Sequence, residues 1–397
     1  MKIALLGINS NLIRTRTQER IIDFLKNKLY EIGENTSLIS YFENNFTQLQ
    51  TIYERDYNLI FCIGTNQSIY NHNIKENLSR ILGDKLHQEK SCHSAIEKYC
   101  ADHNIPFSSA EKLESEMPTR SIALYNSNCS NYGFMYKTND KYLIYLPDDY
   151  DFVVSNFNQY ILPLLHDLSQ DNLECSIIRC YGILEKDIRN LLNDEMNNGK
   201  ISIQIQSLRL DNIIYIRHSN QHNEIIQELL STICSKLNKF IYAMENTDLY
   251  ETAHYLLNLH KKQLVVAETL TLGNITKNIC LKDNNLICDS FVFNNFNSIT
   301  KHLNLDNKII ETYGKYSVNT VYELDNLLLE KSNANIAIFI LGESGFDTCY
   351  IAIGDLDGIH VYKNKIYTCD ENLIDNISET ALFYLIKKLR KNDLQFS

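Results

Sequence analysis

Short apolar runs alternate with stretches of helical periodicity along the first 170 residues, a pattern typical of an α/β sheet protein. Residues 2–6 and 58–63 are apolar runs suited to buried strands, and Gly64 ends the second run. Between them, apolar residues recur at helical spacing from Ile21 to Ile32. The same reasoning predicts helices at 73–82, 92–102 and 151–167, and strands at 121–125 and 142–146.

The polar residues 166–174 are typical of a linker, and two further α/β regions follow them. The first predicts strands at 175–180, 201–206 and 212–217, and helices at 184–194 and 222–240. The second predicts helices at 248–260, from 271, at 318–331 and at 372–390, and strands at 263–267, 286–293, 335–341, 348–354 and 359–363. We therefore predict three domains, at 1–168, 169–245 and 246–397.

Length and charge narrow the class of protein. A chain of 397 residues is too long for one ordinary core, and its net charge of −11 disfavours direct binding to nucleic acid. The basic residues 387–391 fall at the end of a predicted helix, where cations offset the helix dipole. No apolar run is long enough for a membrane span or a signal peptide. We therefore expect a cytoplasmic protein without membrane contact.

The cysteines do not indicate a metal site. There are 11, an odd number, and no CxxC pair occurs, which favours reduced thiols. Cys92, His93, Cys100 and His103 lie near one another in sequence, but their spacing matches no standard zinc module. We expect neither a metal nor a cofactor.

Candidate chemistry lies where strands end, because ligands of open α/β sheets bind beyond the carboxyl ends of the strands. Three segments qualify, at 64–68, 147–151 and 267–273. In the third, a hydroxyl on a strand-to-helix turn could lie beside unpaired N–H groups that hold an oxyanion. The alternative is that Thr269 or Thr271 caps the helix.

The order of several short stretches resembles the CinA (competence/damage-inducible protein A) family over nearly the whole chain. The matching stretches are Phe24–Leu29, Ile63-Gly64, Lys75–Gly83, Asn126, Gly133-Phe134, Leu146-Pro147, Tyr181–Leu191, Ala267–Gly273, Gly314 with Ser317, and Gly342 with Gly345. The resemblance implies an N-terminal three-layer α/β/α domain like molybdopterin-binding proteins, a small α+β middle domain and a C-terminal α/β amidohydrolase-like domain. It also implies a homodimer.

In the N-terminal domain the chain departs from the family pattern. The family has a Gly-rich turn followed by paired aspartates, and this chain has Thr65, Gln67, Asn71 and His72 there. An amide and an imidazole do not replace two hard oxygen ligands for a magnesium-type ion. The three aspartates of the 147–151 turn could form a replacement metal site or could cap a helix.

The C-terminal domain is altered in a similar way. Thr269 takes the position of the family's nucleophilic serine, between Glu268 and Thr271, and we expect Thr271 to cap the following helix. The resemblance implies that Glu268, Thr271, Gly273, Asn294 and Gly342 contact the substrate. Asn294 and Ile299 stand where the family has tyrosine and lysine, so the pair Asn294→Tyr and Ile299→Lys is expected to raise turnover.

These departures predict a divergent relative of nicotinamide mononucleotide deamidases with weak or no turnover, which could still bind a pyridine nucleotide. Three alternatives stay open. The chain could be an active amidohydrolase that uses Thr269, an N-terminal pyrophosphatase acting on ADP-ribose-like molecules, or a non-catalytic interaction scaffold.

Overall fold

The computed structural model describes residues 1–9, 15–65, 68–125, 132–138, 141–168, 173–219, 223–343, 345–366 and 372–393. Contacts within the chain divide it into two compact units. The first consists of Met1–Cys175 and Arg217–Gln221, and the second of Ser176–Ile216 and His222–Ser397. The second unit contains a complete sheet and most of another, and the division into three domains stays a prediction.

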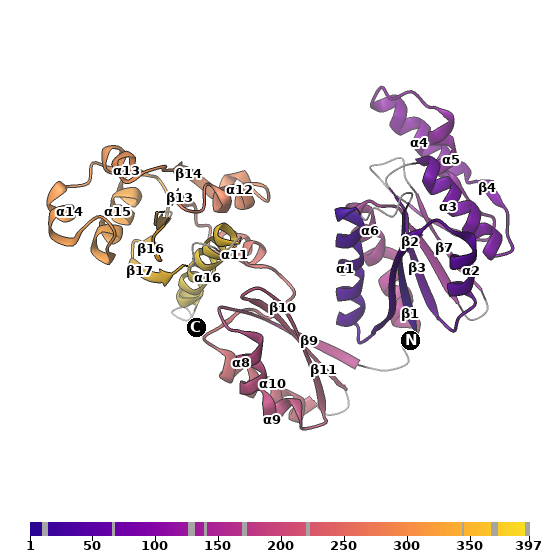
Figure 1. The fold of residues 1–397 in the computed structure, drawn as a ribbon, viewed down its shortest axis with the longest axis horizontal. Coiled ribbons are helices and arrows are strands. Elements are labelled where there is room, and N and C mark those ends of the chain that lie inside the picture. Colours follow the sequence, from indigo (N-terminus) through magenta and orange to yellow (C-terminus); the bar gives the residue numbers. More distant parts are fainter. Residues whose placement is uncertain are drawn as a thin grey trace. The chain divides into compact units, whose positions relative to one another are not determined.

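A six-stranded sheet forms the centre of the first unit (Figure 1). Its strand order is β2 (Thr36–Glu43), β1 (Ile3–Asn9), β3 (Leu59–Ile63), β8 (Tyr142–Leu146), β7 (Gly133–Lys137) and β6 (Ile122–Leu124). The first four strands run parallel, and β7 and β6 are antiparallel to their neighbours. Parallel strands are buried on both faces, which explains their continuous apolar sequences.

Helices cover both faces of this sheet. Ile3 and Leu5 of β1 belong to one apolar cluster, with residues of α1 (Arg16–Glu31), α6 (Tyr150–Asn156), the π-helical turn η1 (Phe157–Ile161) and α7 (Leu162–Leu168). Ala4, Leu6 and Ile8 belong to another, with residues of α2 (Phe46–Tyr53), α3 (Ser68–Ile81) and α4 (Lys90–Asp102). Beside α3 lie α5 (Ser109–Glu114) and a two-stranded antiparallel sheet of β4 (Leu86–Gln88) and β5 (Glu116–Pro118). The predicted three-layer α/β/α arrangement is confirmed.

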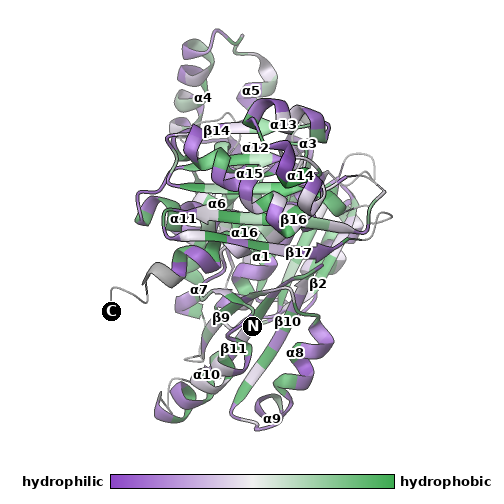
Figure 2. Ribbon diagram, turned by 90° about the vertical axis from the view of Figure 1, so that its left-hand side faces the viewer, coloured by the Kyte–Doolittle hydropathy of each residue, from purple (hydrophilic) through white to green (hydrophobic). Residues whose placement is uncertain are grey.

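Three helices pack on the middle sheet through one apolar cluster. Its order is β10 (Ile201–Leu208), β11 (Asp211–Ser219), β9 (Leu173–Tyr181) and β12 (Ile241–Ala243). Its apolar cluster joins the strands to α8 (Glu185–Leu191), α9 (Asn193–Met196) and α10 (Asn223–Leu237). Figure 2 shows both hydrophobic and hydrophilic colour along α8 and α10, as expected for helices with one buried face.

The third sheet has the order β14 (Ile287–Val292), β13 (Leu264–Glu268), β15 (Ile336–Leu341), β16 (Thr348–Asp355) and β17 (Gly358–Lys365). The first three strands are parallel, and the last two are antiparallel to their neighbours. One face packs on α11 (Leu249–Leu259), α12 (Asn274–Cys280), the 3-10 turn η2 (Asn284–Leu286) and α16 (Leu373–Asp393). The other packs on α13 (Phe296–Leu303), α14 (Asn307–Tyr313) and α15 (Val318–Lys331).

Most predicted elements are present, and the differences have physical causes. The helix predicted from 271 begins at Asn274, and the one predicted at 184–194 is divided into α8 and α9. Strand β2 was not predicted, because it lies at a sheet edge and its exposure is mixed along its length. Of the helices in the described ranges, none combines the length and apolar character that a membrane span requires.

Candidate functional site

The C-terminal candidate site lies where three parallel strands end. Glu268 is the last residue of β13, Asn294 follows β14 closely, and Gly342 follows β15 directly. The Phe293 N–H donates to the Glu268 carbonyl at 2.8 Å, which holds the end of β14 beside that of β13. The sheet therefore brings the predicted site residues to one edge, where α/β proteins bind ligands.

Thr269 is held by two main-chain hydrogen bonds. Its hydroxyl donates to the Ile340 carbonyl at 3.0 Å and accepts from the Gly342 N–H at 3.0 Å. The side chain thus connects the end of β13 to the end of β15. A hydroxyl whose proton is donated to a carbonyl is not positioned to pass that proton to a base, as a nucleophile must.

Glu268, not Thr271, caps helix α12. The buried Glu268 carboxylate accepts the Ile275 N–H at 3.3 Å, the Thr276 N–H at 3.1 Å and the Thr276 hydroxyl at 2.9 Å. These are two of the N–H groups that a helix leaves unpaired in its first turn. A carboxylate here also complements the helix dipole.

The prediction that Thr271 caps the helix is wrong. Thr271 is fully buried, and its hydroxyl has no hydrogen-bond partner among the described residues. The cap position is occupied by Gly273, with φ of 85°, and the preceding Leu272 is also left-handed, with φ of 52°. These two residues turn the chain, so the helix begins three residues beyond Thr271.

Two leucines, Leu270 and Leu272, lie in the turn between β13 and α12 and differ in burial. Leu270 is partly buried and lies against Gly342, since a Cβ added to Gly342 would be 2.3 Å from Leu270 Cδ1. Leu272 is 63% exposed, so it does not fill the space around Thr269. Its left-handed backbone costs about 1–2 kcal/mol in a residue other than glycine.

Asn294 and Ile299, at the family's tyrosine and lysine positions, are not the hydrogen-bond partners of the Thr269 hydroxyl. Asn294 is exposed, and the neighbouring Asn295 caps α13 by accepting the Ser298 N–H at 2.9 Å. Ile299 is completely buried in the core between α13 and the sheet.

An aromatic cluster that sequence reasoning missed adjoins Thr269. Tyr316 donates a hydrogen bond from its hydroxyl to the Glu343 carboxylate, and Glu343 directly follows Gly342. The Tyr316 ring lies 5.3 Å from that of Phe346 and 5.8 Å from that of Phe296. Burial and the Glu343 carboxylate raise the pKa of Tyr316 to about 12. Sequence reasoning singled out only the nearby Gly314 and Ser317. The contact between Tyr316 and Glu343 was missed because residues 27 positions apart leave no local sequence signal.

In the first unit, Asn71 stands at one of the positions of the family's aspartates and belongs to a buried polar network. The Asn71 carboxamide accepts the Thr65 N–H at 2.9 Å and donates to Glu114 at 3.4 Å. Lys75 and Glu114 form a fully buried ion pair, with 3.2 Å between Lys75 Nζ and Glu114 Oε2. His72 lies 3.5 Å from the Glu116 carboxylate. Gln67 and Asn126 lie outside the described residues.

The aspartate-rich turn serves as a cap. Asp149 accepts the Phe152 N–H at 3.0 Å and caps α6, which confirms the capping alternative. Asp148 accepts the Thr15 hydroxyl at 2.7 Å. Within the described ranges, no group of three or more His, Cys, Asp or Glu residues is placed to hold a metal ion.

Comparisons with known proteins show which class this arrangement belongs to. No family model matches the chain. A Clostridium botulinum protein named competence-damage inducible protein is 21% identical over 411 aligned positions, covering 98% of this chain and 100% of the relative. A protein of the same name from Caldicellulosiruptor saccharolyticus is 23% identical over 278 residues, covering 68% of each chain.

Solved structures are similar to parts of the chain. A CinA superfamily protein from Klebsiella pneumoniae is 19% identical, with a TM-score of 0.34, and covers 36% of this chain and 96% of its own. A molybdenum cofactor biosynthesis protein B is 17% identical, with a TM-score of 0.28, and covers 42% of this chain and 92% of its own.

The three α/β sheets thus accompany a similarity to competence-damage inducible proteins that spans nearly the whole chain. These similarities support membership of the CinA family, at low sequence identity.

Proposed function

We propose that this chain is a CinA-family protein whose C-terminal site binds a pyridine nucleotide but hydrolyses its carboxamide weakly or not at all. The observation that carries the proposal is the bonding of the Thr269 hydroxyl, which donates to the Ile340 carbonyl and accepts from the Gly342 N–H. The residue at the family's nucleophile position thus acts as a link between two strand ends.

Hydrolysis of an amide needs an activated nucleophile and donors for the oxyanion. To attack a substrate, Thr269 would have to break its bond to Ile340 and find a base. Asn294 and Ile299, at the positions of the family's tyrosine and lysine, supply none. General-base help contributes about 10²–10⁴ in rate, so its loss alone makes turnover slow. Leu270 also lies against Gly342, which limits how closely a substrate approaches that backbone.

The aromatic cluster of Phe296, Tyr316 and Phe346 supports ligand binding at the same edge. Phe346 is 49% exposed, so its ring offers a surface on which a flat heterocycle can stack. The Glu343 carboxylate beside it complements the positive charge of a pyridinium ring. Nicotinamide mononucleotide has such a ring, and the cluster is therefore a reasonable place for it.

Two measurements on the full chain test this proposal: ammonia release from nicotinamide mononucleotide, and calorimetric binding of the same compound. We expect binding without release, and binding that weakens in Phe346→Ala while the exposed control Tyr313→Ala leaves it unchanged. Release that is lost in Thr269→Ala would instead establish an active amidohydrolase. If the chain neither binds the compound nor releases ammonia from it, the interaction scaffold is favoured.

The N-terminal pyrophosphatase is not favoured, because the positions expected to ligate a metal are Asn71, bonded to Thr65 and Glu114, and His72, close to Glu116. The homodimer implied by the family and the cytoplasmic location expected from the sequence belong to the same proposal. Sedimentation at several protein concentrations tests the first, and fractionation of cells tests the second.

A further inference from the structure

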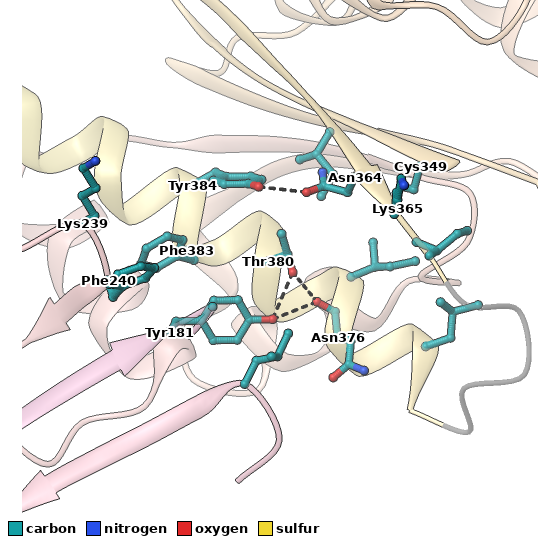
Figure 3. Close-up of a pocket in the computed structure, with 16 residues that line it drawn as sticks. Tyr181, Lys239, Phe240, Cys349, Asn364, Lys365, Asn376, Thr380, Phe383 and Tyr384 are labelled. Atoms are coloured by element: carbon teal, nitrogen blue, oxygen red, sulfur yellow. Dashed lines mark hydrogen bonds between the residues drawn. The ribbon is translucent and has the colours of Figure 1, made fainter. Parts of the chain in front are cut away.

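A cavity of about 540 Å³ lies within the second unit, away from Thr269. It is bordered by α16, by β16 and β17 of the third sheet, and by the end of β9 in the middle sheet (Figure 3). Sites for small molecules commonly have volumes of about 300–1,000 Å³ and combine apolar walls with a few polar groups. Thr269, Tyr316 and Glu343 are not among its lining residues, so it is distinct from the candidate site.

The walls of the cavity are apolar and rigidly supported. Ile351 is fully buried in the core of the third sheet, and Phe383 comes from α16. Tyr384 stacks on Tyr362 of β17, with 3.7 Å between ring centroids and 10° between ring planes. A ligand with an apolar body would meet preformed surfaces, which reduces the ordering that binding costs.

Two polar groups point into this apolar space. The Tyr384 hydroxyl donates to Asn364 Oδ1 at 2.8 Å, which leaves the hydroxyl oxygen able to accept a further bond. The Tyr181 hydroxyl lies 3.0 Å from Thr380 Oγ1 and donates to the Asn376 carbonyl at 3.1 Å. In Figure 3 the bonded pair Tyr384 and Asn364 lies above Tyr181 and Thr380. They restrict the orientation of a ligand without adding charge.

The charged side chains that line the cavity have one sign. Among the described residues that line it, the only charged side chains are Lys239 and Lys365, although the whole chain has a net charge of −11. Both lysines are exposed, and Figure 3 places them toward opposite ends of the cavity. No carboxylate among these lining residues competes for them. A cavity with apolar walls and cationic ends is complementary to an amphipathic anion.

We propose that this cavity binds a small amphipathic anion, with its apolar body against the half-buried Phe383 and Leu373 and its anionic group beside Lys239 or Lys365. The site is separate from the pyridine-nucleotide site, and neither proposal depends on the other.

Calorimetry of the full chain with three probes of equal chain length tests the charge preference: sodium octanoate, octan-1-ol and octylammonium chloride. We expect octanoate to bind about tenfold or more tightly than octylammonium, because only the first complements the lysines. Equal affinity for the anion and the cation, or no octanoate binding at millimolar concentration, would overturn the proposal.

Charge-reversal variants locate the site. Lys239→Glu or Lys365→Glu is expected to weaken octanoate binding about five- to tenfold. The control Lys308→Glu reverses an exposed lysine at the start of α14 and is expected to leave binding unchanged. Equal weakening in all three variants would indicate a general charge effect and refute a local site.

A filling variant tests the cavity itself. Thr380→Phe places a ring in the space and is expected to abolish octanoate binding, while the exposed control Thr312→Phe of α14 leaves that binding unchanged. If Thr380→Phe does not fold, the lysine variants still decide the question. Full octanoate binding by a folded Thr380→Phe protein would contradict the proposed location.

Discussion

At the scale of single residues, two threonines two positions apart differ in what their hydroxyls do. Thr269 makes two hydrogen bonds with the main chain, whereas the hydroxyl of buried Thr271 has no partner among the described residues. A buried polar group costs free energy when it lacks a partner, and it leaves its partners unsatisfied when it is removed.

This contrast predicts opposite effects of the same substitution. Thr269→Val leaves the Ile340 carbonyl and the Gly342 N–H without their partner and is expected to lower the free energy of unfolding by about 1–3 kcal/mol. Thr271→Val replaces an unpaired hydroxyl with a methyl group, so its effect is expected to lie between neutral and about 1 kcal/mol of stabilisation. Urea denaturation of the two variants measures the difference, and equal destabilisation would contradict it.

The burial of Ile299 changes the outcome expected from restoring the family lysine. Ile299 has no exposed surface, so Ile299→Lys places an ammonium group in the core instead of at the site. We expect this variant to lose about 3 kcal/mol or more of stability and to gain no turnover. Ile299→Leu is the matched control and should retain most of the stability. A folded, more active Ile299→Lys protein would show that the core opens at this position.

At the scale of elements, the turn between β13 and α12 combines a strong cap with a strained backbone. The Glu268 carboxylate bonds to two N–H groups of the helix, while Leu272 has a left-handed conformation. The helix start is thus held in place although one residue of the turn is unfavourable.

Leu272→Gly is expected to stabilise the protein. Relief of the left-handed conformation gains about 1–2 kcal/mol, and the greater freedom of glycine in the unfolded chain offsets about 0.5–1 kcal/mol. The expected net effect therefore lies between neutral and a gain of about 1.5 kcal/mol, measured as a shift in the midpoint of thermal unfolding. Leu272→Ala keeps the unfavourable φ and should show no such gain.

Sequence patterns predicted the buried strands well and the caps poorly, for a physical reason. An apolar run such as 58–63 specifies a strand by itself, and β3 occupies nearly those residues. The cap of α12 depends on Glu268 meeting N–H groups seven and eight residues further on, across a left-handed turn. The Tyr316–Glu343 contact likewise depends on the packing of α15 against β15. Long-range contacts of this kind have no periodic sequence signal.

At the scale of the whole molecule, one buried carboxyl makes stability depend on pH. Asp325 of α15 has no exposed surface, and neither of its oxygens has a hydrogen-bond partner among the described residues. Burial raises the pKa of Asp325 well above its ordinary value of 3.8, although nearby Lys388 acts in the opposite direction. Lys388 is itself paired with Asp355, at 2.8 Å.

The sign of the pH effect follows from this raised pKa. Above about pH 4 the unfolded chain releases the Asp325 proton, while the folded protein retains it until a higher pH. The contribution of Asp325 therefore makes the protein less stable as the pH rises from about 4 toward the raised pKa. We expect Asp325→Asn to reduce this fall and to be more stable than the unaltered protein at about pH 8. Urea denaturation from about pH 5 to pH 8 measures it, with the exposed Asp357→Asn as control.

The two hydrogen bonds of Thr269 also affect which mutations this protein can accept during evolution. In a catalytic ancestor, the hydroxyl at this position would be available to a substrate, whereas here it joins two strands and contributes to folding. A mutation that freed it for chemistry would first weaken the native state, and selection discards variants that fall below the stability they need. Under the proposed function, recovery of hydrolysis is therefore expected to need a stabilising change elsewhere beforehand, such as relief of the strain at Leu272. The order in which substitutions accumulate is thus constrained by a single side chain.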